Sequence, residues 1–219
     1  MSKVPGHAIK KKGRLVKRIL ANGGKIIKKV IVAKLKHDTV NKKTTQSREF
    51  QPNVSPSEMF KLGVFGGTYW RPIFSSVIGE NLARQHEEFR PLGWWDGISA
   101  GALSSSKFDP TKNHFGVKAG SSLDDWESKH WIVPQDPYGW VQWYCRYVAG
   151  RRSPDDQRQI QRWLNFAGPK GRFRRNVIKR MREAHAAGGD WKIVSPVIQQ
   201  GLLQWGSKIE DEEIIIKLK

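Results

Sequence analysis

Cysteine occurs only once among the 219 residues of this sequence, at Cys145. One cysteine cannot form an intramolecular disulfide, so the chain suits a reducing compartment. A single thiol cannot build a cysteine-rich zinc site either. The histidines show no metal-ligand spacing; they are His7, His37, His86, His114, His130 and His185. We therefore expect neither a metal nor a cofactor.

Long apolar segments are also missing. No run approaches the ~18 residues of a membrane span, so we expect no membrane partner. The chain opens with Lys and Gly where a signal peptide has an apolar segment, so we expect it not to be secreted. The predicted location is inside a cell, in the cytoplasm or nucleus, or in a virion made there. Hydrophobic residues make up only 38% of the chain, but ten tryptophans supply large buried areas for a core.

Acidic residues are scarce in two segments, and these segments carry the whole net charge of +19. Residues 1–49 hold 15 Lys and Arg against two acidic residues, and residues 146–182 hold 12 against two. The remainder has 12 basic and 16 acidic residues and is slightly acidic. Basic charge that is clustered in this way is typical of a protein with a polyanionic partner.

The composition divides the chain into a basic arm and linker over 1–57, a globular domain over 58–206, and a tail or short strand over 207–219. In the arm, "ANGG" between apolar runs fits a hairpin turn or the junction of two basic helices. Such an arm is either a disordered solubilising tail or a segment that becomes ordered on nucleic acid. "GVFGG" lacks the strand-to-helix context of a phosphate loop and indicates a buried turn.

Helical patterns dominate after residue 136, so we expect a mainly α fold with a turn-rich N-terminal half. In "DPYGWVQWYCRYVAG", Trp140, Trp143, Tyr144 and Tyr147 have the i, i+3, i+4, i+7 spacing of one buried helix face. We expect Cys145 to be buried on this helix rather than activated by an adjacent arginine. "SPDDQRQIQRWLNFAG", "GRFRRNVIKRMREAHAAGG" and "SPVIQQGLLQWG" predict three further helices.

The segments "KLGVFGGTYW", "DPYGWVQWYCRYVAGRR", "DDQRQIQRW" and "LLQWG" resemble, in order and spacing, a family of small uncharacterised proteins of bacteria, phages, large DNA viruses and some fungi and algae. The resemblance covers about residues 60–206 and implies no settled activity. It implies that the structural or functional centre contains Gly63, Phe65, Gly66, Gly67, Tyr69, Asp136, Gly139, Trp140, Trp143, Arg146, Arg151, Arg152, Arg158 and Arg162.

The cations of residues 151–182 are the candidate nucleic-acid ligands. Like charges spaced along one helix destabilise it mildly, so a partner rich in phosphates would compensate. The candidates are Arg151, Arg152, Arg158, Arg162, Lys170, Arg172, Arg174, Arg175, Lys179, Arg180 and Arg182. No base-reading motif accompanies them, so we expect contacts mainly to phosphates, with double-stranded DNA favoured over RNA. The alternative for this face is an acidic protein partner.

Two other features carry weaker functional hypotheses. Trp94 and Trp95 lie in a loop, where they either stack on bases or cap the core. "FAGPKGRFRR" is similar to the glycine-bearing hairpin of DNA-repair proteins, which makes Asp190 a candidate catalytic residue of a base-excising enzyme. Asp136 is a separate candidate catalytic residue of a base-modifying or base-excising enzyme. The sequence favours a binding protein over an enzyme, and a structural subunit of a virion or ribonucleoprotein is a further alternative.

Overall fold

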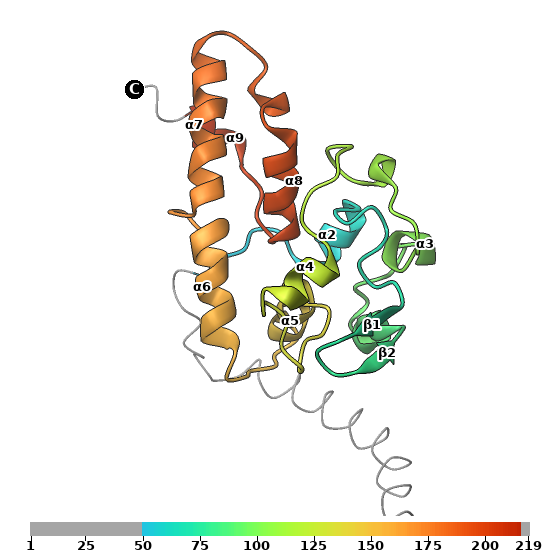
Figure 1. Cartoon of the computed structure of the whole chain (residues 1–219). Coiled ribbons are helices and arrows are strands. Elements are labelled where there is room, and N and C mark those ends of the chain that lie inside the picture. The colour runs from blue at the N-terminus through green and yellow to red at the C-terminus, as the bar shows by residue number, and fades with distance from the viewer. Residues whose placement is uncertain (1–49, 216–219) are drawn as a thin grey trace, which may run out of the picture. The chain divides into compact units, whose positions relative to one another are not determined.

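The structure, a computed structural model, describes residues 50–215 of the chain, so residues 1–49 of the predicted arm and linker over 1–57 lie outside the described residues (Figure 1). The described part is mainly helical, as predicted. Its elements in chain order are α2 (Pro56–Lys61), β1 (Ile73–Ser75), β2 (Glu80–Leu82), η1 (Gln85–Leu92), α3 (Ala100–Leu103), η2 (Pro110–Lys112), α4 (Leu123–Ser128), α5 (Trp140–Val148), α6 (Asp156–Phe166), α7 (Arg172–Ala186), η3 (Trp191–Ile193), α8 (Pro196–Gln204) and α9 (Asp211–Ile215).

Short elements joined by turns make up the part before α5. Strands β1 and β2 form an antiparallel hairpin in which Ile73 lies opposite Leu82. "GVFGG" forms a tight buried turn after α2, and the backbone passes very close to Gly63. This glycine has φ +59°, and a Cβ on it would lie 1.9 Å from the carbonyl oxygen of Lys112. Only glycine fits at that point, as expected for a buried turn.

Helices α6 and α7 follow one another along one side of the domain, and α8 lies beside α7 (Figure 1). Residues 211–215 form helix α9 where the sequence predicts a tail or a short strand. This helix packs on α7, and Ile214 is fully buried. An ion pair between Glu213 and Arg174, and hydrogen bonds from Arg182 to the carbonyl oxygen of Glu213, hold this helix to α7.

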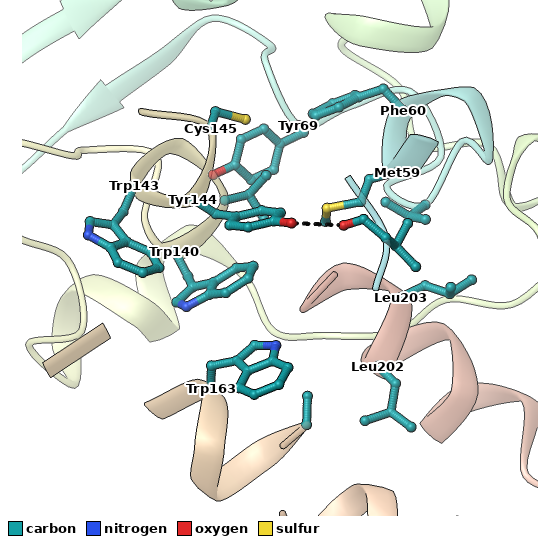
Figure 2. Packing of buried hydrophobic residues seen from close by; sticks show 14 of the residues in the cluster. Met59, Phe60, Tyr69, Trp140, Trp143, Tyr144, Cys145, Trp163, Leu202 and Leu203 are labelled. Carbon is teal, nitrogen blue, oxygen red and sulfur yellow. Dashed lines mark hydrogen bonds between the residues drawn. The ribbon is translucent and has the colours of Figure 1, made fainter. Parts of the chain in front are cut away.

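The core is built around α5 (Figure 2). Trp140, Trp143, Tyr144 and Tyr147 are at most 7% exposed, so the predicted buried stripe is confirmed. Cys145 is also fully buried, and burial raises the pKa of its thiol well above the ordinary value. The four aromatic side chains of this helix therefore belong to the core.

The end of the predicted linker belongs to this core. Phe50 is 1% exposed and packs edge-on against Tyr147 and Trp163. The hydroxyl of Tyr144 donates a hydrogen bond of 3.0 Å to the carbonyl oxygen of Val54 (Figure 2). The predicted boundary at residue 57 is therefore too late, because the domain already includes residue 50.

Candidate nucleic-acid interface

Asp136 is the centre of a buried ion-pair cluster. Its carboxylate is fully buried and accepts hydrogen bonds from Arg146 (Nη1–Oδ1 2.9 Å) and Arg151 (Nη1–Oδ1 2.8 Å and Nη2–Oδ2 2.6 Å). Arg146 also binds Glu88 at 2.7 Å. Both carboxylate oxygens of this candidate catalytic residue are engaged by arginines, and Arg151 directs two of its N–H groups to them. We therefore expect Asp136 to stabilise the fold.

Three other predicted phosphate ligands are engaged within the domain. Arg158 pairs with Asp155 one turn earlier, at 2.5 Å. The guanidinium of Arg174 is 11% exposed and binds a carboxylate of α9, at Glu213, at 2.5 Å. Arg182 donates to the backbone carbonyl of the same residue at 2.6 Å. These arginines fasten α6 to its own first turn and α9 to α7. Carboxylates neutralise Arg158 and Arg174, whereas the partner of Arg182 is a neutral carbonyl group, so Arg182 keeps its charge.

Of the remaining predicted cations, Arg162 on α6 is half-buried and the others are exposed. Most of the exposed ones lie on α7 and the turn before it. The side chains of Lys170 and Arg175 form no ion pair or hydrogen bond with any residue between 50 and 215. Arg172 lies over the ring of Phe173 at 4.7 Å. Lys179 has only an exposed pair with Glu183, at 3.7 Å, and such pairs contribute little to stability.

Two exposed cations have weaker local partners. The guanidinium of Arg152 lies 3.8 Å from the ring centre of Tyr147 and donates to that residue's carbonyl oxygen at 2.8 Å. Arg180 donates to the hydroxyl of Ser195 at 3.2 Å. Both partners are neutral, so both charges remain available to an anion.

A groove of about 2530 Å³ runs along α6, α7 and α8, with the segment around residues 126–141 forming its other wall. Seven basic side chains and three acidic ones line it. The basic ones are Arg162, Lys170, Arg172, Arg174, Arg175, Lys179 and Arg182, and the acidic ones are Glu183, Glu212 and Glu213. The groove therefore carries net positive charge, and exposed cations of α7 are part of its lining.

Aromatic rings line the groove as a continuous series. Trp140 lies against Trp205 with ring centres 4.8 Å apart, Trp205 stacks on Phe166 at 5.0 Å, and Phe166 lies against Phe173 at 4.3 Å. The series begins in the core at α5 and reaches α7, where Arg172 covers its last ring. Each of these four side chains lines the groove.

Arg162 lies inside this aromatic lining. Its guanidinium is 5.5 Å from the ring of Trp131 and 5.4 Å from that of Trp205. Its hydrogen bonds go to neutral oxygens, Oε1 of Gln159 at 2.9 Å and the carbonyl of Trp131 at 3.4 Å. Burial, together with the nearby charge of Arg158, lowers the pKa of Arg162 to about 10, so the group is cationic at neutral pH.

The structure places the other candidates away from this groove. Trp95 is 4% exposed and donates its indole N–H to the carbonyl of His86 at 2.6 Å, so it caps the core and does not project as a wedge. Trp94 stacks on Phe89, with ring planes 10° apart. Asp190 is exposed and caps η3 by accepting from the backbone N–H of Lys192 at 2.9 Å. Neither of the two candidate catalytic residues, Asp136 and Asp190, lines the groove.

Sequence reasoning missed the aromatic residues of the groove. Trp131 is 38% exposed, and its ring also lies 5.0 Å from the ammonium group of Lys129. The only local signal was the neighbouring lysine in "SKHWIV", because the contact with α6 joins segments 31 residues apart. The helix pattern assigns Phe173 to the apolar side of its helix, and nothing in the local sequence marks Phe166 or Trp205 as lining a groove.

No family model matches the chain, and no curated protein or solved structure is similar enough to be matched with it. The resemblance of its motifs to a family therefore stays a prediction. Among residues 50–215, none of the helices has the length and apolar character needed to cross a membrane. In the same range, no cluster of three or more His, Cys, Asp or Glu side chains could bind a metal ion.

Proposed function

We propose that the protein binds nucleic acid, with DNA as the expected form, through the exposed cations of α7 and the turn before it. The observation that carries this proposal is the contrast between two groups of cations. Arg151, Arg158 and Arg174 are paired with carboxylates. Lys170 and Arg175, on the turn and the helix that line the groove, have no such partners among residues 50–215.

The physical argument is electrostatic. Arg172, Arg175 and Lys179 follow one another at three- and four-residue spacing on α7, where like charges destabilise a helix by a few tenths of a kcal/mol per pair. Phosphates remove this repulsion, and their neutralisation releases counterions, which favours binding. Contacts of this kind position a duplex without reading its sequence. We therefore expect binding to be largely independent of base sequence.

The test is a direct binding measurement on the full-length chain. Fluorescence anisotropy with a labelled 20-base-pair duplex, at low salt, compares the natural sequence with a variant in which Arg172, Arg175 and Lys179 are changed to Gln. The matched control changes Lys61, Arg84 and Lys107 to Gln. These three are also exposed but do not line the groove. We expect the α7 variant to bind at least tenfold more weakly, with the control within about twofold of the natural sequence.

Two results would contradict the proposal. Equal losses in the two variants would mean that only the total charge matters, and that α7 holds no site. Absence of binding by the natural sequence at low salt would remove the proposed function altogether. Circular dichroism of each variant checks that the helices are intact, which we expect because all six side chains are exposed.

A further inference from the structure

The residues that line the groove indicate contacts with bases as well as with phosphates. A duplex keeps its bases paired and stacked inside, so it presents mainly phosphates and sugars to a basic surface. Cations alone would satisfy it. Here the cations alternate with aromatic rings: Arg162 lies over Trp131 and Trp205, and Arg172 lies over Phe173. Positive charge that alternates with aromatic faces is the arrangement by which proteins hold single strands, because each nucleotide offers one phosphate and one flat base.

The burial of Arg162 and its lack of an ion pair also favour a ligand whose phosphates enter the groove. It lines the groove, it is removed from much of its solvent, and it forms no ion pair with any residue from 50 to 215. Removing a cation from water without a counter-charge is costly. Arg151 and Arg174 avoid this cost through carboxylates at 2.6 and 2.5 Å. A phosphate that enters the groove would supply the missing counter-charge, since a planar guanidinium fits phosphate oxygens in a bidentate manner.

Trp131 provides an exposed ring next to this cation. It is one of the seven large hydrophobic side chains exposed in the described residues, and the only tryptophan among them. Trp131, like Arg162, lines the groove. An indole held at the wall of a basic groove can stack with an unpaired base. An apolar peptide would also cover the ring, but the seven cations in the groove lining favour an anionic chain.

We infer that the groove holds unpaired nucleotides, with a phosphate bound by Arg162 and a base against Trp131, so that the preferred ligand is DNA with a single-stranded segment. The inference rests on the proposed function and names the form of nucleic acid that the same surface prefers. The exposed cations of α7 would contact the phosphates that follow along the strand.

The experiment compares four ligands of one base sequence with the full-length chain: a blunt duplex, a duplex with a ten-nucleotide overhang, a DNA single strand and an RNA single strand. We expect the overhang and the DNA single strand to bind about tenfold more tightly than the blunt duplex, since each stacked base contributes about 1–3 kcal/mol. Tryptophan fluorescence should be quenched by the strands and much less by the duplex.

Four single variants locate the effect. Trp131→Ala and Arg162→Gln should each reduce the preference for the DNA strand over the duplex by about fivefold or more. Phe74→Ala is the matched control, because this ring is 58% exposed on β1 and does not line the groove. It should leave the preference unchanged. Arg162→Lys keeps the charge but loses the planar group, so we expect only partial recovery.

The possible results of these binding measurements separate the inference about unpaired nucleotides from the proposed function of α7. If the blunt duplex binds as tightly as the strands, and Trp131→Ala has no effect, the inference is overturned while the role of α7 in the proposed function stands. If no ligand binds, both fail. If the RNA strand binds more tightly than the DNA strand, the unpaired-nucleotide site is supported and the assignment to DNA is overturned. If Phe74→Ala lowers the preference as much as Trp131→Ala, the groove is not the site.

Discussion

The role of Asp136 can be tested by the substitution Asp136→Asn, which keeps the shape of the side chain and removes its charge. In the structure this carboxylate accepts three hydrogen bonds of 2.6–2.9 Å from two guanidinium groups and is itself fully buried. The amide would offer one acceptor oxygen and turn an N–H₂ group toward cationic donors. Two arginines would then lack their common counter-charge.

The expected loss can be estimated from the exposure of the partners. Removing one member of a buried ion pair costs about 3–5 kcal/mol. The side chains of Arg146 and Arg151 are 16% and 28% exposed, and Arg146 keeps Glu88, so water and that carboxylate compensate in part. We therefore expect a loss near the lower limit, about 3 kcal/mol, which corresponds to a fall in Tm of about 6–12 °C for a domain of this size.

Thermal unfolding and urea unfolding, both followed by circular dichroism, measure the change in Tm and in unfolding free energy, and a double-mutant cycle with Arg151→Gln measures the coupling. The double variant should be much less destabilised than the sum of the two single variants, because the two side chains share one interaction. A fall in Tm of less than 2 °C would refute the structural role. An unchanged stability combined with the loss of a chemical change in DNA would instead identify Asp136 as a catalytic residue.

Three further predictions concern the core. Cys145 is fully buried with a raised thiol pKa, so at pH 8 it should react with a thiol reagent only after unfolding, and rapid labelling of the native protein would contradict this. Burial raises the pKa of Tyr138 to about 12 and that of Tyr69 above its ordinary value, so the folded state holds these protons more tightly than the unfolded chain. The contribution of these two tyrosines to stability is complete below about pH 10 and is lost as the pH rises through their folded pKa values. The urea concentration at the unfolding midpoint should therefore be lower at pH 11 than at pH 9, and equal midpoints would contradict this expectation. Gly63→Ala should destabilise the fold far more than the control Gly79→Ala. Both positions have positive φ, but only the first substitution would place a Cβ 1.9 Å from a backbone oxygen. Equal unfolding midpoints of the two variants would refute the close contact.

Local patterns predicted much of the helical part. The spacing of the four aromatic residues on α5 depends only on the helix period, and all four are buried as that period requires. The buried turn at Gly63 could also be predicted, because glycines of that density indicate close packing of the backbone. The burial of the α5 stripe follows from the helix period alone. The oxygen that approaches Gly63 belongs to Lys112, 49 residues later, so the glycines predict a close approach of the backbone but not its partner.

The availability of each cation could not be predicted in the same way. Arg174 is neutralised by Glu213, 39 residues later, and Arg146 by Glu88, 58 residues earlier. Arg172, two positions before Arg174 on the same helix, keeps an exposed charge. Adjacent arginines in one basic run therefore differ in role because the fold brings distant carboxylates to some of them. The exposure of Trp131 and the burial of Trp95 depend on tertiary packing in the same manner.

The salt dependence of DNA binding tests the central claim most directly. The logarithm of the binding constant falls with the logarithm of salt concentration, with a slope of about −0.9 for each phosphate contact on a duplex and about −0.7 on a single strand. Changing Arg172, Arg175 and Lys179 to Gln should make the slope less negative by about 2 to 3, while changing Lys61, Arg84 and Lys107 should leave it unchanged. Equal slopes for the natural sequence and the α7 variant would show that these cations contact no phosphate, and would contradict the account.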